Sequence, residues 1–509
     1  MGDLVAPKMK IQKAFVEVEG RRVHYRRCGA GPVLLLLHQS PKSSREYEPL
    51  MAEWGAHFTC IAPDTPGYGF SQPLPGRPRD LAAYADATCA FLDALGLEQP
   101  LVYGFHTGAA IAAELAARHP DRVRALVANG YVVLTEQERN DFLMHYLPEF
   151  VPSWDGSHLA WLWARLREQV IFFPWYQRTR AARMVYDMPP PEVLHENAME
   201  FLHAGDHYRD AYGAAFRWEG ERVLPRITVP ALVIASDKDP LCAHLQRLPS
   251  PPPNCEITSC PTQQAVQDRA LAFFRSQSTP DEASPIGATG TYPATGYVSS
   301  GSRQIRLRHD GKGTGRPVLM LHDIGEQGDL VETNGEQSTI IPDLPGHGLS
   351  DPADGPISLP SMAEALNALL VELDAGPVTV RAKGVSCLIA AEMQRIAPDR
   401  VLNVDADLVE LSRITHWADY CRKRFPALEP NVHGGHLLEA WLVVRNGALF
   451  EPWYEQRAGS IVQKEPDISP PTVHRKLIAL LDSLPTSHAV MMASIDYPFE
   501  QRLRQLAGS

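Results

Sequence analysis

Short apolar runs alternate with longer amphipathic stretches in the first half of the chain. The apolar runs stop at turn residues and predict buried strands at residues 33–37, 58–64, 100–104, 123–130 and 230–237. Helical spacing predicts helices at residues 81–97, 109–119 and 264–274, and residues 15–29 resemble an opening β-hairpin. Strands that alternate with helices predict an α/β fold, with a mostly parallel sheet covered by helices on both faces.

Residues from about 134 to 222 interrupt this alternation. They are helical in pattern, rich in aromatic side chains, and lie between two expected core strands. We expect them to form a helical cap over the carboxyl ends of the strands, where sheets of this kind bind ligands. An aromatic cap predicts a pocket for a small hydrophobic or aromatic carbonyl substrate.

The chain repeats itself at an offset close to 278 residues. The segment CIAPDTPGYGFSQP, which begins at Cys60, matches TIIPDLPGHGLSDP, which begins at Thr339, at eight of fourteen positions. HPDRV ending at Val123 matches APDRV ending at Val401, and FFPWYQR in the cap matches FEPWYEQR in the second half. Several matches in one register indicate an internal duplication.

The repeat predicts two tandem domains joined by a linker. Residues 1–277 form the first domain, and residues 278–303, rich in Pro, Gly, Ser and Thr, form the linker. Residues 304–509 form a second domain with its own cap, and they stop before the counterparts of the last core strands of the first copy.

Composition and charge exclude several kinds of partner. Of the 509 residues, 44% are hydrophobic and 21% are charged, and the net charge is −12 without a dense basic block, so we expect no nucleic-acid or anionic-membrane partner. The aliphatic run Val33–Leu37 is far too short to span a bilayer. The eight cysteines are scattered, which predicts reduced thiols in a cytoplasmic protein. No dinucleotide or phosphate-binding loop appears, so we expect no organic cofactor.

Several motifs together give the chain a family resemblance. HQSP follows an expected strand, and PDTPGYGFS, the GFHTG turn at residues 104–108, HPDRV and SDKDP follow in order. This set resembles the α/β-hydrolase superfamily over nearly the whole chain. The resemblance implies a nucleophile at the turn, then an acid, then a histidine. His106 stands where the serine nucleophile belongs, Asp239 stands where the acid belongs, and Gln263 or Gln264 replaces the final histidine.

The replacement of serine by histidine suggests a different catalytic group. A histidine side chain is longer than a serine side chain, so the ring of His106 is expected to reach Asp239 and form a His–Asp dyad. The resemblance implies an oxyanion hole made by the backbone N–H groups of Gln39 and Thr107. Imidazole is a natural general base near neutral pH and also an allowed nucleophile, and we rank the general base first.

Three functions remain open on the sequence alone. The first is hydrolysis by an activated water, the second is a lyase or decarboxylase that begins with proton transfer beside a carbonyl, and the third is a ligand-binding pseudoenzyme. His106 can also be an inactive remnant, Asp239 a helix cap, and His38 a prop of the neighbouring loop. These three residues lack the spacing of a metal site, so we expect no metal.

Five further residues are candidates for contact with the substrate. They are polar or aromatic residues of the HQSP loop and the cap, namely His38, Trp175, Tyr176, His158 and His207. Pro174, Trp175, Tyr176 and His158 recur in the second half, which also favours a role in the architecture of the cap.

The second copy is predicted to be inactive. Gly384 stands at its counterpart of position 106, and the segments that would carry its acid and its final histidine are missing. A sheet that stops early leaves apolar surface and unpaired backbone groups. We therefore expect the second copy to pack on the first as one half of a pseudo-dimer.

Overall fold

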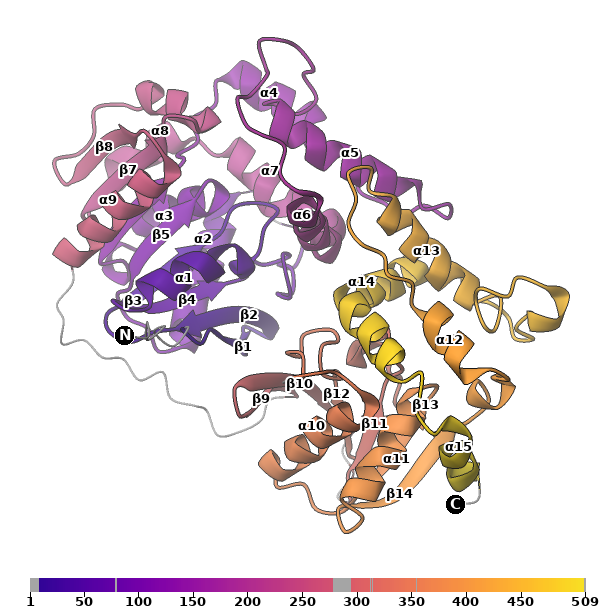
Figure 1. Cartoon of the computed structure of the whole chain (residues 1–509). Helices are drawn as coiled ribbons and strands as arrows, with labels where there is room; N and C mark the ends of the chain where they lie inside the picture. Colours follow the sequence, from indigo (N-terminus) through magenta and orange to yellow (C-terminus); the bar gives the residue numbers. More distant parts are fainter. Residues whose placement is uncertain are drawn as a thin grey trace, which may run out of the picture. The chain divides into compact units, whose positions relative to one another are not determined.

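The chain folds into two compact units. The computed structural model describes residues 9–77, 80–277, 294–311, 313, 315–353 and 355–507 (Figure 1). The first unit comprises Met1–Val151 and Leu162–Ala288, and the second comprises Pro152–Trp161 and Thr289–Ser509. Residues 152–161 of the predicted cap thus group with the second unit, which the predicted division at residue 277 did not foresee.

The first unit is built on one mixed sheet of eight strands. In chain order they are β1 (Gln12–Val18), β2 (Arg21–Cys28), β3 (Val33–Leu37), β4 (Thr59–Pro63), β5 (Leu101–Phe105), β6 (Ala125–Asn129), β7 (Ala231–Ser236) and β8 (Cys255–Cys260). Their order across the sheet is β1-β2-β4-β3-β5-β6-β7-β8. The hairpin strands β1 and β2 are antiparallel to their neighbours, and all pairings from β4 to β8 are parallel. The predicted hairpin and parallel strands are therefore present.

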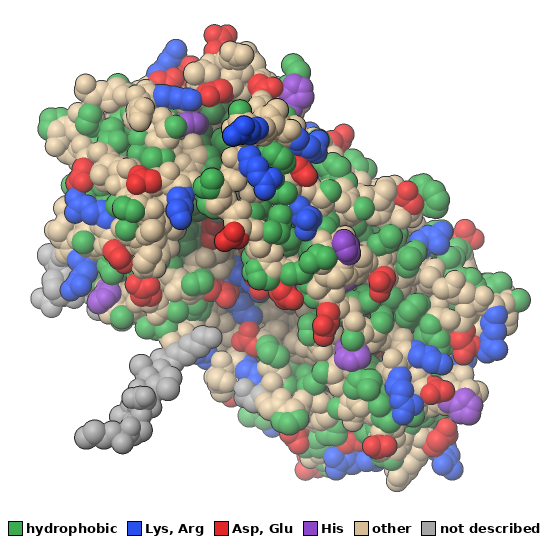
Figure 2. Space-filling view, turned by 45° about the horizontal axis from the view of Figure 1, so that its top comes forward, with side chains coloured by type: hydrophobic (Ala, Val, Ile, Leu, Met, Phe, Trp, Pro, Cys, Tyr) green, Lys and Arg blue, Asp and Glu red, His purple; other side chains and the backbone are tan. Residues whose placement is uncertain are grey.

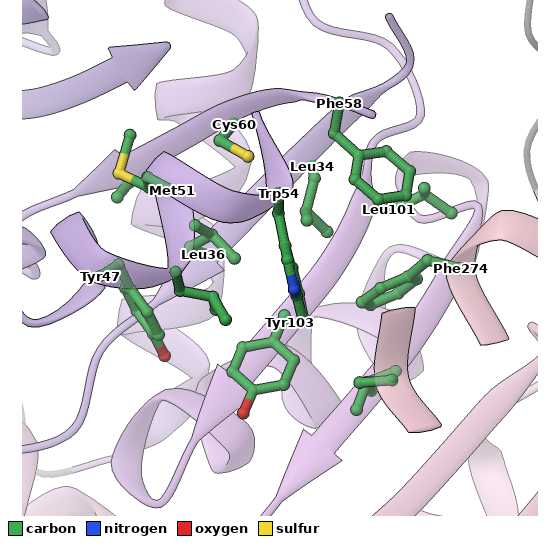
Figure 3. Packing of buried hydrophobic residues seen from close by; sticks show 14 of the residues in the cluster. Leu34, Leu36, Tyr47, Met51, Trp54, Phe58, Cys60, Leu101, Tyr103 and Phe274 are labelled. Carbon is green, nitrogen blue, oxygen red and sulfur yellow. The ribbon is translucent and has the colours of Figure 1, made fainter. Parts of the chain in front are cut away.

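Helices cover the first sheet as an α/β fold requires. They are α1 (Glu48–Trp54), α2 (Leu81–Ala94), α3 (Thr107–Arg118) and α9 (Gln263–Ser276). Residues of α1 and α9 share one core cluster with β3, β4, β5 and β7 (Figure 3). In its centre the ring of Trp54 meets the rings of Tyr103 and Phe274 edge-on, at centroid distances of 5.6 and 6.4 Å. Edge-on packing of this kind is favourable for aromatic rings and fixes the α1–sheet contact.

Helical residues fill the interval between β6 and β7, where the cap is predicted. They form α4 (Glu136–His145), α5 (Ser157–Ile171), α6 (Pro191–Ala204), α7 (Arg209–Arg217) and α8 (Gly220–Val223). Helix α4 begins with a capping box, in which Thr135 and Glu138 each accept a hydrogen bond from the other's backbone N–H. The first turn of α5 belongs to the second unit and the rest of the helix to the first.

The second unit contains a six-stranded sheet. Its strands are β9 (Thr295–Ser300), β10 (Arg303–Asp310), β11 (Val318–Leu321), β12 (Thr339–Pro342), β13 (Val378–Lys383) and β14 (Val401–Asp407). The order is β14-β13-β11-β12-β10-β9, which read from β9 repeats the order of the first six strands of the first unit. Its helices are α10 (Leu359–Glu372), α11 (Ser386–Ile396), α12 (Trp417–Arg424), α13 (Gly435–Gly447), α14 (Pro470–Ala493) and α15 (Phe499–Ala507).

The predicted linker is too long at its C-terminal end. Residues 278–293 lie outside the described residues, but β9 begins at Thr295 and pairs with β10 in an antiparallel hairpin. The alternation TGYVSS is short and contains Gly and Ser, so its composition resembles a linker although it forms an edge strand.

The exposed positions of β14, at the open edge of the second sheet, are mostly polar, with Leu402 as an exposed apolar residue among them. Strand β14 is an edge strand, and its exposed positions include Asn403, Asp405 and Asp407. Asp405 also forms an exposed ion pair with Arg381 of the neighbouring strand at 2.8 Å. Charged side chains on an edge strand discourage pairing with another chain.

The described surface shows no segregation of charged and hydrophobic side chains on the face in view. Acidic, basic and hydrophobic side chains are interspersed on the face shown in Figure 2. Within the described ranges, no helix is both long and apolar enough to cross a lipid bilayer.

Candidate functional site

A sharp turn between β5 and α3 presents His106. Its backbone has φ 49° and ψ −108°, a region that residues other than glycine seldom adopt. Two glycines make the turn possible, because a Cβ at Gly104 would lie 2.2 Å from the oxygen of Gly108, and a Cβ at Gly108 would lie 1.9 Å from the oxygen of Leu37. The GFHTG sequence thus lets α3 approach the sheet closely while the side chain of His106 projects beyond the end of the strand.

The His106 ring contacts Asp239, as the sequence predicts. Nε2 of His106 lies 2.7 Å from Oδ2 of Asp239, and the side chains are 27% and 8% exposed. Asp239 follows β7 and also caps the short helix after it, because its Oδ1 accepts the backbone N–H of Leu241 at 2.8 Å. The capping role and the dyad contact therefore coexist, one on each carboxylate oxygen.

This arrangement fixes the tautomer of a neutral His106. An ionised carboxylate only accepts hydrogen bonds, so Nε2 must carry the proton and Nδ1 keeps the lone pair. Burial raises the pKa of Asp239, but the His106 ring and the N–H of Leu241 outweigh burial and hold the pKa below its usual value. Asp239 is therefore ionised at neutral pH, and Nδ1 of His106 is the basic atom of the pair.

The two predicted oxyanion-hole residues differ in what their N–H groups do. Thr107 is the first residue of α3, so its N–H has no acceptor within the helix. The N–H of Gln39 instead donates to Oε2 of Glu46 at 3.2 Å, and the side chain of Gln39 donates to the other oxygen of Glu46. The backbone N–H of Gln39 is thus occupied, which corrects its predicted role.

The second unit indicates which N–H group belongs with that of Thr107. His38 and His322 make equivalent hydrogen bonds in the two units. In each, Nδ1 donates to the backbone carbonyl of the following residue at 2.8 Å. In each, Nε2 accepts a backbone N–H at 2.9 Å, that of Thr65 for His38 and that of Leu344 for His322. Asp323 therefore stands at the position of Gln39, and its Oδ1 accepts the N–H groups of Ile324 and Val385 at 2.8 Å each.

These two N–H groups have direct counterparts in the first unit. Val385 follows the β13–α11 turn as Thr107 follows the β5–α3 turn, and Ile324 corresponds to Ser40. In the second unit, this pair of N–H groups converges on one carboxylate oxygen. By this correspondence, Ser40 and Thr107, rather than Gln39 and Thr107, are the candidate donors to an oxygen at the first elbow.

The dyad and these donors line a cavity of about 230 Å³ under the cap. Its lining includes Gln39, Ser40, His106, Thr107 and Asp239 from the core. The cap side is mainly apolar and aromatic, and its residues include Phe142, Tyr146, Gln169, Phe173, Met184, Tyr186, Tyr212 and Phe216. The volume suits a compound of one aromatic ring with small substituents.

His38, predicted as a substrate contact, is a structural residue. Its side chain is buried, and both ring nitrogens are occupied: Nδ1 donates to the carbonyl of Gln39 at 2.8 Å and Nε2 accepts the N–H of Thr65 at 2.9 Å. His38 therefore fixes the loop that carries Ser40, and does not line the cavity.

The four other predicted substrate contacts also lie outside the cavity lining. Trp175 donates its indole N–H to the carbonyl of Tyr146 at 3.0 Å, and Tyr176 donates its hydroxyl to Asp141 at 2.5 Å. His207 pairs with Asp210 at 2.8 Å. These contacts brace the cap.

His158 belongs to the second unit rather than to the pocket. Its ring lies 4.9 Å from that of Trp441 and 5.5 Å from that of His474. Burial in this aromatic setting lowers the pKa of His158 to about 4. The recurrence of the cap motif in both halves was the signal that favoured architecture over ligand contact.

Sequence reasoning missed several residues that do line the cavity. Tyr186 and Tyr212 lie in segments without a recognisable motif, and Gln169 stands on α5 among ordinary helix-forming residues. The hydroxyl of Tyr186 donates to the carbonyl of Lys238 at 2.6 Å, which ties the cap to the loop before Asp239. Only the packing of the cap brings these side chains to the dyad.

In the described part of the chain, no group of three or more His, Cys, Asp or Glu side chains is placed to hold a metal ion. His38, His106 and Asp239 do not form a metal site, because both ring nitrogens of His38 are hydrogen-bonded to the backbone.

The family comparison addresses the first unit directly. The family model of the alpha/beta hydrolase fold matches residues 32–251. We call this matched stretch the α/β-hydrolase region. This stretch includes the elbow, the cap and Asp239, so the site described above lies within the α/β-hydrolase region.

Curated relatives of this α/β-hydrolase region are hydrolases of different kinds. The chain is 33% identical over 133 residues to an uncharacterized hydrolase of Saccharomyces cerevisiae, which is 25% of this chain and 43% of that protein. It is 35% identical over 106 residues to haloalkane dehalogenase 2 of Mycobacterium bovis, covering 21% and 37%. It is 31% identical over 128 residues to 2-(acetamidomethylene)succinate hydrolase of Mesorhizobium japonicum, covering 25% and 46%. The chain thus spans less than half the length of each of these relatives.

Proposed function

We propose that the first unit is a hydrolase that uses His106 as a general base toward a small hydrophobic or aromatic ester-type substrate. The observation that carries the proposal is the 2.7 Å contact between Nε2 of His106 and Asp239 at the wall of the capped cavity. It leaves Nδ1 as the base, on a residue that lines the same cavity as Ser40 and Thr107. The hydrolase relatives support the reaction class.

The reaction proceeds without a serine ester. Nδ1 of His106 takes a proton from water, and the hydroxide oxygen bonds to the carbonyl carbon of the ester. The carbonyl oxygen becomes an anion that the N–H groups of Ser40 and Thr107 stabilise. The carbon–oxygen bond to the alcohol then breaks, and the leaving alkoxide takes the proton from Nδ1, which yields a carboxylic acid and an alcohol. Asp239 stabilises the imidazolium between these steps.

We infer that the second unit is a duplicated and inactive copy of the first. Gly384 offers no side chain at its elbow, and a Cβ there would lie 2.4 Å from Oδ2 of Asp323. The carboxylate of Asp323 also occupies the two N–H groups that correspond to the oxyanion hole. Asp323 thus fills the position that a substrate oxygen takes in an active copy.

Replacement of His106 tests the proposed function. His106→Ala should lower kcat for small aryl esters such as phenyl acetate at least roughly a hundredfold, because a general base contributes about that much or more. Asp239→Asn should cost less, since Asp239 acts through the ring. The measurement is steady-state hydrolysis by the purified full-length protein.

His119 provides a matched control at the other end of α3. It pairs with Asp86 at 2.8 Å, as His106 pairs with Asp239, but Asp86 is 47% exposed whereas Asp239 is 8% exposed. His119→Ala should leave kcat unchanged. A kcat of His106→Ala close to that of the wild type would contradict the catalytic proposal and favour a ligand-binding pseudoenzyme.

A further inference from the structure

A buried arginine stands behind the cap wall of the cavity, and among the described residues it has no anionic partner. Arg165 of α5 is 1% exposed, and its guanidinium carbon lies 5.2–5.3 Å from the ring centroids of Trp175, Phe201 and Tyr208. Its Nε and Nη2 have no hydrogen-bond partner among the described residues, and no described carboxylate pairs with it. A cation so enclosed is costly unless a negative charge balances it.

Gln169 connects this cation to the cavity. One helical turn after Arg165, the side-chain oxygen of Gln169 accepts a hydrogen bond from Nη1 of Arg165 at 3.1 Å. This bond orients the amide, because its oxygen faces the guanidinium and its NH2 group is left to donate elsewhere. Gln169 lines the cavity, so it presents donors, not an acceptor, to a ligand.

The neighbouring polar groups of the cavity have the same character. Tyr212 donates its hydroxyl to that of Tyr146 at 3.3 Å, which leaves the hydroxyl proton of Tyr146 for another acceptor. Burial raises the pKa of Tyr146, and the hydrogen bond from Tyr212 and the positive charge of Arg165 both oppose that rise. Among the residues that line the cavity, the single carboxylate is Asp239, which His106 and Leu241 already occupy.

We propose that Gln169 binds a carboxylate group at the cap end of the substrate, with Arg165 as the positioning residue that supplies the balancing charge. The substrate class is then a small aromatic or aliphatic ester or ketone-like compound with one free carboxylate. The proposal rests on the proposed function only in taking this cavity as the ligand site.

Binding of non-hydrolysable ketones tests the proposal separately from catalysis. The probes are 3- and 4-acetylbenzoate, each compared with the 3- or 4-ethylacetophenone of the same shape, by isothermal titration calorimetry on the full-length protein. Ketones contain no ester bond, so the result does not depend on turnover. At least one acetylbenzoate should bind about ten- to a hundredfold more tightly than its ethyl analogue, the size expected of a hydrogen bond to a charged group.

Two variants identify the residues responsible. Gln169→Leu should bring the affinity ratio to one or below, because it removes the donors and leaves the carboxylate without a partner. Arg165→Met should also bring the affinity ratio to one or below, and its thermal melting curve shows whether this variant folds. If Arg165→Met does not fold, the result for Gln169→Leu decides the test. Gln177→Leu, an identical change at an exposed cap position, should leave the ratio unchanged.

Two results would overturn the proposal. One is that neither acetylbenzoate binds more tightly than its ethyl analogue, or that neither binds at all. The other is an unchanged affinity ratio in Gln169→Leu. If His106→Ala loses esterase activity but still prefers acetylbenzoate over its ethyl analogue, both the proposed function and this inference are supported. If His106→Ala keeps this preference and also keeps full activity, only the proposed function is overturned.

Discussion

Asp239 serves two structural elements with its two oxygens. Oδ1 holds the N–H of Leu241 at the start of a short helix, and Oδ2 holds Nε2 of His106. Both partners favour the ionised carboxylate, which explains why its pKa is lowered although burial alone would raise it. The orientation of the His106 ring thus depends on the charge state of Asp239.

Asp239→Asn gives a pH-dependent loss of stability. The folded-state pKa of Asp239 lies below its unfolded value of about 3.9, so its stabilisation is present above that pH and is lost as pH falls through the folded pKa. The difference in unfolding free energy between wild type and Asp239→Asn should be largest near pH 6 and shrink toward pH 2. Pulse proteolysis in urea, followed on peptides of the first unit, measures it.

The neighbouring Asp237 provides the comparison. It is exposed at the same end of β7, so Asp237→Asn should change stability by less than about 0.5 kcal/mol at every pH. A wild-type advantage over Asp239→Asn that stays constant from pH 6 to pH 2 would contradict the ion-pair account.

At the scale of elements, the ends of β5 and β6 together set the direction of the His106 ring. Gly130 follows β6 with φ 72°, and a Cβ there would lie 2.2 Å from Cδ2 and 2.8 Å from Nε2 of His106. The N–H of His106 also donates to the carbonyl of Asn129 at 2.9 Å. The absence of a side chain at Gly130 therefore leaves the space in which the ring reaches Asp239.

Gly130→Ala should separate His106 from Asp239. The added methyl group occupies the place of the ring, so kcat should fall at least about tenfold, and the left-handed backbone should cost about 1–2 kcal/mol. Gly96→Ala is the matched control, because Gly96 has φ 65° and nothing within 4 Å of its built Cβ. Gly130→Ala should lose more stability than Gly96→Ala in thermal unfolding, because it also breaks the contact between His106 and Asp239, and only Gly130→Ala should lose turnover. Equal turnover in the two variants would contradict this account of the ring position.

The sequence predicts the elements with strong patterns and misses those with weak ones. The positions of β3 and α3 are predicted correctly, because both segments consist mostly of apolar residues that are buried in the structure. Strand β8, with the sequence CEITSC, is an edge strand with mostly polar, half-exposed residues, so no apolar run signals it. The contact between His106 and Asp239 follows from the order of motifs, whereas the choice of Ser40 over Gln39 depends on where a backbone N–H points, which composition does not encode.

The cap shows the same limit for side chains. Trp175 and Tyr176 are prominent in sequence because they recur, but recurrence reflects the architecture common to both halves. Gln169 and Tyr212 reach the cavity only through the crossing of cap helices, and neither lies in a motif. The residues that line the cap side of the cavity are thus the least predictable part of this site.

At the scale of the whole molecule, the division into units does not follow the division into repeats. The segment Pro152–Trp161 comes from the first repeat but groups with the second unit. A Cβ at Gly156 would lie 2.9 Å from side-chain atoms of Leu438 and Trp441, so the segment is closely packed there. The second unit therefore contains a piece of the cap that completes the first repeat.

Removal of the second repeat should consequently destabilise the first. A fragment of residues 1–276 keeps His106, Asp239 and the cavity, but it leaves residues 152–161 without the packing of Trp441 and His474 around His158. We expect this fragment to aggregate or to melt well below the full-length protein, and to lose esterase activity through disorder of the cap. The control is the full-length chain with a protease site within residues 278–293, cleaved after folding, because both repeats are then still present. The cleaved protein should keep its activity and melting temperature, since the packing and not the covalent link maintains the cap. A soluble and fully active fragment would show instead that the second repeat is dispensable for the first.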